Sequence, residues 1–157
     1  MRRDYFTLDV RDVDWVDAGE QPHKPLVRID FHGPRELLTE RLTGGDGELL
    51  AASEIDVAFR LVDALDTEDA SGVVGVTNRM TGDFILELNE SAEDVLRFIR
   101  AAREFGRTAD ADDGQYRVEI TLEDDDLVVY EKGTFLVYDA EGNLLRSESL
   151  IPSGVEL

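Results

Sequence analysis

The sequence has 157 residues, with 36 acidic and 16 basic side chains, no cysteine and a formal charge of −20 at pH 7. This length suits a single domain, and a hydrophobic fraction of 42% excludes general disorder. The acidity argues against nucleic acid or an anionic membrane as a partner, because both repel an acidic surface. The lack of cysteine excludes thiol catalysis, disulfides and thiolate metal sites.

The charged residues are skewed in kind as well as in number. Aspartate (20) outnumbers glutamate (16), and arginine (14) far outnumbers lysine, which occurs only at Lys24 and Lys132. Acidic residues are spread from Asp4 to Glu156 instead of forming a tail. Molar salt shortens the Debye length to about 3 Å and removes most of the self-repulsion of such a chain. The composition therefore predicts a cytoplasmic protein of an organism with molar internal KCl.

Neither a targeting segment nor a membrane-spanning segment is recognisable. The residues after Arg3 continue directly into a strand-like pattern, which fits neither a secretory nor a twin-arginine signal. No run approaches the roughly 18 apolar residues that a membrane helix needs. We expect an intracellular protein without a membrane partner.

Alternation of apolar and polar residues with a period of two is the dominant pattern. It predicts up to nine strands whose short separators favour antiparallel neighbours, with residues 80–83 forming one hairpin turn. The predicted strands are residues 6–10, 27–31, 55–61, 73–78, 84–88, 116–122, 127–130, 134–138 and 144–150.

Two segments break the alternation and predict helices. Residues 33–42 carry Pro34 near the start and are followed by glycines, which is the usual asymmetry of a helix. A stronger helix begins at Ser91, which forms a variant of a capping box with Asp94, and Gly106 stands where a C-terminal cap would lie. We therefore predict an α+β fold: one domain with a mostly antiparallel sheet of about eight or nine strands and two helices packed on a face.

The two histidines are the residues best suited to acid–base or metal chemistry. His23 lies between two prolines and is predicted to be a solvent-exposed loop residue. His32 ends the second predicted strand, two residues after Asp30, so that the two side chains share a face. Asp30 and His32 are therefore our candidate metal ligands, although the same pattern also fits a strand-end histidine beside an acidic neighbour.

Other motifs for ligands are incomplete. Residues 110–114 fail the calcium-loop pattern, because Gly114 occupies a ligand position and the bidentate glutamate is missing. Residues 123–126 fit a turn between two strands. The glycines at 44–47 lack the Lys-Ser/Thr of a phosphate-binding loop, and there is neither a dinucleotide fingerprint nor a nucleophile elbow. We expect no cofactor and no catalytic residue, and the balance leans against an enzyme.

One feature runs against the overall charge. A stripe of arginines covers about a third of the circumference of the helix that begins at Ser91. Such a stripe could dock an acidic partner or a phosphate-bearing ligand, whereas pairing with Glu93 and Glu104 along the same helix would make it structural. The stripe consists of Arg97, Arg100, Arg103 and Arg107.

Trp15 is the only tryptophan, and we predict that it anchors the core; an interface aromatic is the alternative. The opening MRRDYFTLDV and the helix VLRFIRAAREFG (residues 95–106) resemble a family of short, acidic, uncharacterised proteins from halophilic archaea. The resemblance implies no activity and transfers no residue role, but it agrees with a salt-adapted cytoplasm.

These observations lead to one expectation and two alternatives. We expect a non-catalytic protein that binds another macromolecule or a second copy of itself, with the arginine stripe as its binding surface. The first alternative is a divalent-metal-dependent hydrolase that uses Asp30 and His32. The second is a small-ligand sensor with an apolar pocket between sheet and helices.

Overall fold

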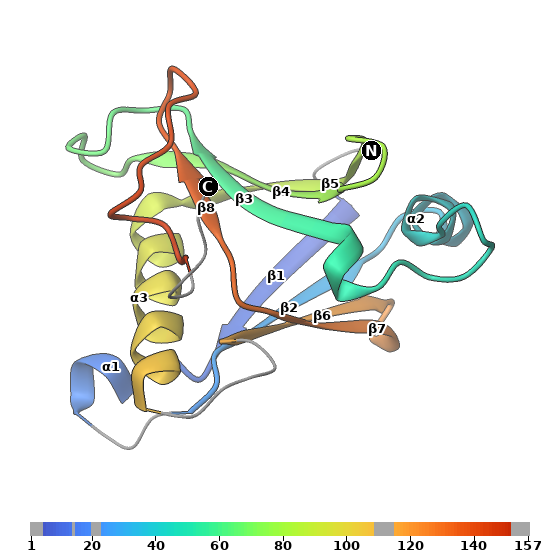
Figure 1. Ribbon diagram of the computed structural model, residues 1–157, viewed down its shortest axis with the longest axis horizontal. Helices are drawn as coiled ribbons and strands as arrows, with labels where there is room; N and C mark the ends of the chain where they lie inside the picture. Colours follow the sequence, from blue (N-terminus) through green and yellow to red (C-terminus); the bar gives the residue numbers. More distant parts are fainter. Residues whose placement is uncertain (1–4, 14, 20–22, 109–114, 152–157) are drawn as a thin grey trace.

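The computed structural model describes residues 5–13, 15–19, 23–108 and 115–151. Over these residues the chain forms eight strands in two four-stranded sheets that face each other (Figure 1). The first sheet has the order β1-β2-β6-β7, with β1 at Phe6–Arg11, β2 at Leu26–Phe31, β6 at Tyr116–Leu122 and β7 at Asp125–Lys132. The second has the order β5-β4-β3-β8, with β3 at Ile55–Leu61, β4 at Ser71–Asn78, β5 at Phe84–Ser91 and β8 at Leu136–Tyr138.

Helices close the two ends of this arrangement. The long helix α3 (Ala92–Thr108) stands across one end of both sheets, and α2 (Arg35–Leu42) lies at the other end (Figure 1). A four-residue helix, α1 (Trp15–Ala18), packs beside α3, and a 3₁₀ turn, η2 (Ala52–Glu54), leads into β3. The α+β class and the number of strands are as the sequence predicted.

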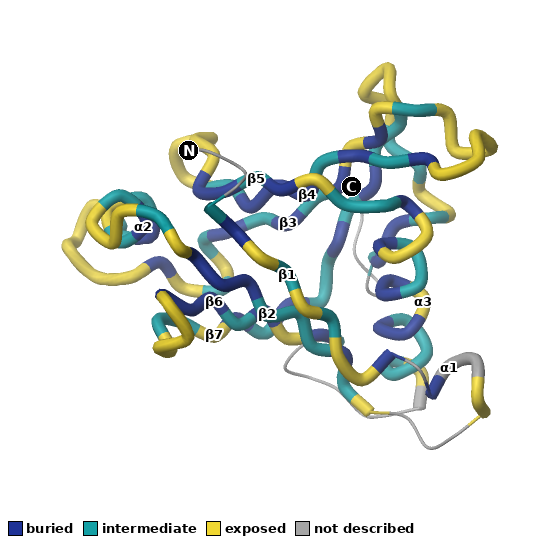
Figure 2. The backbone as a smooth tube through the Cα atoms, turned by 180° about the vertical axis from the view of Figure 1, so that it is seen from behind, coloured by how far each residue is buried: buried dark blue, intermediate teal, exposed yellow. Residues whose placement is uncertain are grey.

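The core lies between the sheets and against α3. The inner faces of the strands are buried along most of their length, as is the side of α3 that faces the sheets (Figure 2). Phe98 of α3 reaches between the sheets and meets Tyr116 of β6 edge-on, with ring centroids 5.3 Å apart. Trp15 is buried beneath this end of the molecule, so the prediction of a core anchor is confirmed.

Each sheet contains one pair of parallel strands, and a crossover connection through the other sheet joins the two strands of each pair. Parallel pairing joins β2 to β6 and β3 to β8, while all other neighbours are antiparallel. The prediction that 127–130 and 134–138 are antiparallel neighbours is wrong. After β7 the chain leaves the first sheet at Gly133, and β8 pairs with β3, where Val137 is completely buried.

Two further predictions need correction. Residues 144–150 do not form a strand: isolated bridges join Tyr138 to Leu144 and Phe135 to Leu150, and between them the Ser149 amide donates to Leu145 O across a turn. Gly106 does not cap α3, because the helix continues to Thr108. A Cβ at Gly106 would lie 2.7 Å from the Gln115 side chain, so the glycine permits close packing instead.

The local turn chemistry follows the sequence. The Ser91 hydroxyl accepts a hydrogen bond from the Asp94 amide at 3.2 Å, which is the predicted cap of α3. The hairpin between β4 and β5 turns through Gly82 at φ +79°, and the Asn78 amide donates to Asp83 O across it. These contacts fix the ends of β4, β5 and α3, which carry the surfaces described next.

Candidate functional site

Asp30 and His32 meet at the end of β2, on one face of the strand as their spacing predicted. His32 Nε2 lies 3.0 Å from Asp30 Oδ2, and the hydroxyl of Thr7 on β1 lies 3.2 Å from the same nitrogen. Asp30 is buried, while His32 is exposed. The imidazole therefore lies over a carboxylate that is itself shielded from water.

Protein donors already occupy the carboxylate of Asp30. The Thr121 hydroxyl donates to Oδ1 at 2.5 Å, and the Asp124 amide donates to the same oxygen at 2.9 Å. Burial by itself would raise the pKa of Asp30, but these hydrogen bonds and the charges of His32 and Arg28 outweigh it, so the pKa lies below 3.8. The ionised carboxylate ties the turn after β6 to β2.

Within the described ranges, no group of three or more His, Asp or Glu side chains has a geometry that could hold a metal ion. Asp30 and His32 supply two ligands at most, and the carboxylate is committed to protein donors. The weak calcium-loop candidate, residues 110–114, lies outside the described residues. His23 is exposed in its loop, and of the turn predicted at residues 123–126 only 123–124 lie between the strands, because β7 begins at Asp125.

The arginine stripe is engaged within the molecule. Arg103 Nη2 donates to Ser149 O at 2.9 Å and to Ser147 O at 3.4 Å, which attaches α3 to the segment after β8. Arg107 pairs with Glu104 at 2.9 Å, one helical turn away. Arg97 and Arg100 also have interaction partners. The stripe therefore supplies structural contacts, and its role in binding a partner stays a prediction.

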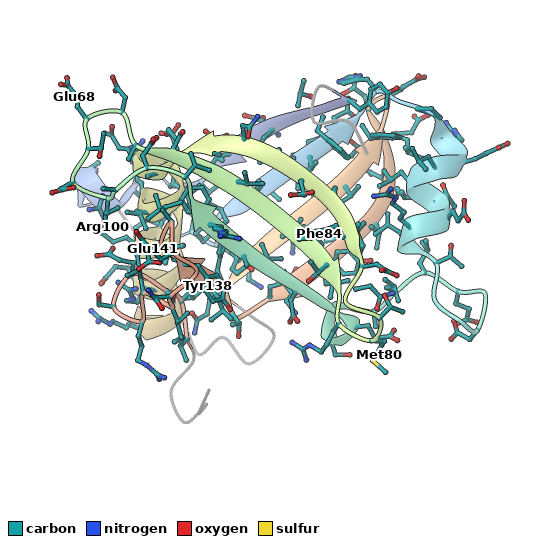
Figure 3. All side chains as sticks on the ribbon, turned by 90° about the horizontal axis from the view of Figure 1, so that it is seen from above. Glu68, Met80, Phe84, Arg100, Tyr138 and Glu141 are labelled. Atoms are coloured by element: carbon teal, nitrogen blue, oxygen red, sulfur yellow. The ribbon has the colours of Figure 1, made fainter. Side chains whose placement is uncertain are left out.

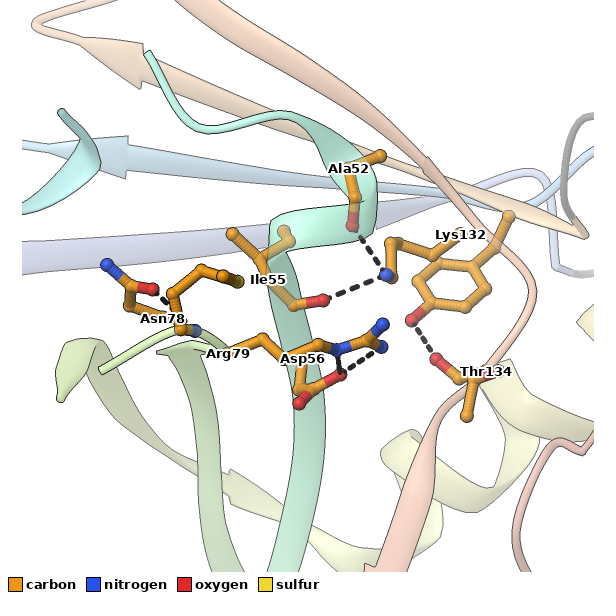
Figure 4. Close-up of polar contacts among 9 residues, drawn as sticks. Ala52, Ile55, Asp56, Asn78, Arg79, Lys132 and Thr134 are labelled. Atoms are coloured by element: carbon orange, nitrogen blue, oxygen red, sulfur yellow. Dashed lines mark hydrogen bonds and ion pairs between the residues drawn. The ribbon is translucent and has the colours of Figure 1, made fainter. Parts of the chain in front are cut away.

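A buried lysine fastens the two sheets together. The ammonium of Lys132, at the end of β7, donates to Ala52 O at 2.7 Å and to Ile55 O at 2.9 Å, across to η2 and β3 (Figure 4). Burial and the nearby guanidinium of Arg79 lower the pKa of Lys132, whereas Asp56 opposes this. Because both acceptors are main-chain carbonyls, we assign this lysine a structural role. Lys24 is paired as well, with Glu131 at 2.7 Å.

The second sheet has an outer face that no helix of the described residues covers. Figure 3 looks onto this outer face, the side of β5-β4-β3-β8 that points away from the first sheet. A shallow groove of about 620 Å³ runs across it between Phe84 on β5 and Tyr138 on β8. The side chains between them are small or uncharged apart from Arg60 and Glu87. The groove is lined chiefly by Ala58, Arg60, Val62, Val73, Gly75, Thr77, Phe84, Glu87 and Tyr138.

Aromatic and apolar groups on this outer face are unusually accessible. Phe84 is 53% exposed and Val62 is 58% exposed. The ring of Phe84 lies over Gly75 of β4, where an added Cβ would be 3.4 Å from ring atom Cε1. The ring therefore packs beside the neighbouring strand at a position that carries no side chain.

Arg60 is an isolated cation on this outer face. The strand register places it beside Val73 of β4 and Tyr138 of β8. Among the ion pairs of the described residues none includes Arg60, although the side chain is exposed. In a protein of charge −20, a cation without a carboxylate partner amid apolar groups is a feature that needs an explanation.

The amino-acid sequence carries one signal for this outer face, which the search for site motifs does not reveal. The strand Ser71–Asn78 has no charged residue, in a chain that is 33% charged. At the positions of this strand that point inward, burial accounts for the lack of charged residues. The outward positions 73 and 75, which are Val73 and Gly75, would ordinarily be polar or charged if that side only met water.

Comparisons with known proteins give a single match. A family model described as a family of unknown function (DUF5793) matches residues 1–157. Neither the curated proteins nor the solved structures contain a significant match. Among the residues described here, none of the helices is both long enough and apolar enough to cross a membrane.

Proposed function

Since the chain belongs to DUF5793, a family of unknown function, we propose from its geometry that it is a non-catalytic protein-interaction module that binds through its outer face. The observation that carries the proposal is the groove between Phe84 and Tyr138, which no described helix covers and in which Arg60 has no ion pair with a described residue. Interface centres are enriched in aromatic residues and arginine, and these three side chains are of that kind.

The composition supports a salt-adapted cytoplasm as the place where it works. In molar KCl, long-range attraction between charged surfaces is screened within about 3 Å. Binding under those conditions has to rely on apolar area and on close, partly desolvated charge pairs. The outer face offers both, whereas the rest of the surface is dominated by carboxylates.

The occupant that this surface fits best is a second copy of the chain. Arg60 on β3 and Glu87 on β5 lie on opposite sides of the central strand β4. A two-fold axis lying in the outer face exchanges these two positions, so that each Arg60 meets the Glu87 of the other copy. Glu87 already has an interaction within its own chain, and the dimer adds the guanidinium of Arg60 from the other copy to it. The same axis packs the apolar centre of one copy against that of the other.

Sedimentation velocity in molar KCl, over a wide range of protein concentrations, tests the proposal. We expect a monomer–dimer equilibrium. Phe84→Asp should raise the dimer dissociation constant by about 30-fold or more, as loss of a central aromatic contact worth ~2 kcal/mol does. Arg60→Glu should weaken the dimer as well, and Arg60→Glu combined with Glu87→Arg should restore it. Arg35→Glu, an equal charge change on exposed α2, serves as the control.

Three results would contradict the proposal. A protein that stays monomeric at every concentration would exclude self-association. A dimer that is insensitive to Phe84→Asp and Arg60→Glu would exclude the outer face. A dimer lost instead in Arg100→Glu with Arg103→Glu would move the interface to the arginine stripe of α3.

A further inference from the structure

A cleft opens at one end of the second sheet, between helix α2 and the hairpin that joins β4 to β5. Its volume is about 760 Å³, which lies within the range of sites that hold small organic molecules. One wall is formed by α2 and residues 43–45, and the other by hairpin residues between 78 and 85. Figure 3 shows α2 and this hairpin, which carries Met80, at the same end of the molecule. Of the described residues, only Phe84 lines both this cleft and the groove of the outer face.

Helical periodicity brings three chemically different side chains to the wall formed by α2. Leu37, Glu40 and Arg41 are three and four residues apart, so they share one side of the helix. Leu38 and Leu42 point to the core instead and are completely buried. The wall of α2 therefore offers an apolar group, a carboxylate and a guanidinium next to one another.

Hydrogen bonds hold both walls in place before any ligand binds. Asn78 Oδ1 accepts a hydrogen bond from the Thr81 amide at 3.4 Å, and the Thr81 hydroxyl accepts one from the Asp83 amide at 3.2 Å. Across the cleft, Arg41 Nη1 donates to the main-chain oxygen of Phe84 at 3.2 Å, which joins α2 to the start of β5. A preformed cleft loses less conformational entropy on binding than one that has to be ordered first.

The three charges of the cleft do not neutralise one another. Arg41 is half-buried and donates to a neutral carbonyl, while Glu40 and Asp83 are exposed, one on each wall. Among the ion pairs of the described residues, none includes any of these three side chains. Opposite charges that line one cleft without pairing are available to compensate the charges of a bound molecule.

This set of charges defines the complementary ligand. One guanidinium and two carboxylates fit a molecule with one carboxylate and two cationic groups. A guanidinium binds a carboxylate through parallel N–H···O contacts, and the single bond to Phe84 leaves Arg41 further N–H donors for this purpose.

We propose that this cleft binds a basic α-amino acid such as lysine, with the α-carboxylate on Arg41 and the two ammonium groups at Glu40 and Asp83. Because the two carboxylates belong to opposite walls, the ligand spans the cleft, and its methylene chain lies along Leu37. This site goes beyond the interaction proposed for the outer face and does not depend on it.

Amide NMR titration at constant molar KCl tests the site with three probes. Lysine carries all three charges, norleucine lacks the side-chain ammonium, and cadaverine lacks the α-carboxylate. We expect lysine to shift the amides of Gly44, Gly45 and Thr81, which line the cleft. Lysine should bind about fivefold more tightly than either of the other probes, which is the contribution of one well-placed ion pair.

Variants separate the contacts to the three charges. Arg41→Gln should lower the affinity for lysine to that for cadaverine and should not weaken cadaverine binding, which also shows that the variant is folded. Glu40→Gln with Asp83→Asn should make lysine and norleucine bind equally. Glu36→Gln, the same change one helical turn earlier on α2 and outside the cleft, is the control and should leave all three affinities unchanged.

A peptide that ends in lysine carries the same carboxylate and side-chain ammonium, so its mimic Nα-acetyl-lysine identifies the source of the ligand. This probe lacks the α-ammonium and should bind about fivefold more weakly than lysine. Equal or tighter binding would exclude a free amino acid as the ligand.

Other outcomes would overturn the site itself. Absence of shifts at the cleft, or equal affinity for lysine, norleucine and cadaverine, would exclude recognition of the three charges. Shifts spread over the whole acidic surface would show general counter-ion association only. Arg60→Glu, which disrupts the proposed dimer and lies outside the cleft, should bind lysine as the wild type does, so that failure of one proposal is distinguished from failure of the other.

Discussion

The Phe84 ring lies beside Gly75 of the neighbouring strand, where a Cβ would be 3.4 Å from ring atom Cε1 and 3.7 Å from Cδ1. Gly75 has an ordinary extended backbone, and its lack of a side chain leaves space beside the Phe84 ring. This contact holds Phe84 on the outer face although the ring is half-exposed. The proposed dimer uses that preformed aromatic surface without having to order it first.

Two glycines of β4 should respond differently to alanine. At Gly75 a Cβ meets the Phe84 ring at an ordinary contact distance of 3.4 Å, so Gly75→Ala should be neutral or raise the free energy of unfolding by about 0.4–1 kcal/mol through the unfolded chain. At Gly72 a Cβ would overlap Arg60 O and approach Phe59 Cζ to 2.7 Å. Gly72→Ala should therefore destabilise by about 1–3 kcal/mol. Urea unfolding in molar KCl measures both, and equal effects would contradict the packing described.

The two buried tyrosines form a second matched pair. Tyr130 has a buried hydroxyl without a hydrogen-bond partner in the described structure, whereas the Tyr116 hydroxyl donates to Thr134 O at 2.7 Å. Tyr130→Phe should be neutral or stabilising by up to about 1 kcal/mol, and Tyr116→Phe should destabilise by about 0.5–1.5 kcal/mol. Denaturant unfolding of the two variants measures the difference.

Tyr130→Phe should also change the stability of the protein at alkaline pH. Burial, together with the charge of Glu54, raises the pKa of Tyr130 to about 12. A group whose pKa is higher when folded stabilises the protein below its unfolded pKa, and that contribution is lost between pH 10 and about 12. Tyr130→Phe should lose less stability across this range than the wild type. An identical alkaline profile would indicate that the hydroxyl is solvated.

Asp30 should govern part of the acid stability. Because its pKa is lower in the folded protein than the ordinary 3.8, it stabilises the fold at higher pH, and the contribution disappears as pH falls through the folded pKa. Asp30→Asn should lower the free energy of unfolding at neutral pH by about 1–3 kcal/mol, since charged hydrogen bonds from Thr121 and Asp124 are replaced by weaker ones. It should also flatten the acid limb of the stability curve below pH 4. His32→Ala, which leaves both donors in place, is the control and should have a smaller effect.

Salt should be required for full stability. A charge of −20 on 157 residues opposes the compact state, and its repulsion is screened only when the Debye length is short. We expect the midpoint of thermal unfolding to rise continuously with KCl up to the molar range, and dilute buffer to unfold part of the protein. Full stability without added salt, measured by circular dichroism, would contradict a salt-adapted protein.

Much of the candidate site depends on contacts that no local pattern encodes. The spacing of Asp30 and His32 predicted that they would share a face, because side chains two residues apart on a strand always do. It could not predict that Thr121, ninety-one residues later, would donate to the same carboxylate. For the arginine stripe, helical periodicity predicted a shared side of the helix, but only the position of the segment after β8 explains why Arg103 binds two carbonyls there.

The sequence by itself determined eight of the nine predicted strands, both main helices, the cap at Ser91 and the hairpin before Phe84. These features depend on alternation, helical periodicity and turn residues, which act over a few positions. The tertiary structure alone decided that the strands divide into two sheets, that β8 joins β3 and not β7, and that Lys132 fastens the sheets together. It also decided which sheet face the described helices leave uncovered and where a cleft opens beside α2. The physical reason is that period-two alternation states which residues face inward, but the partner of each strand is fixed by burial of side chains distant in sequence.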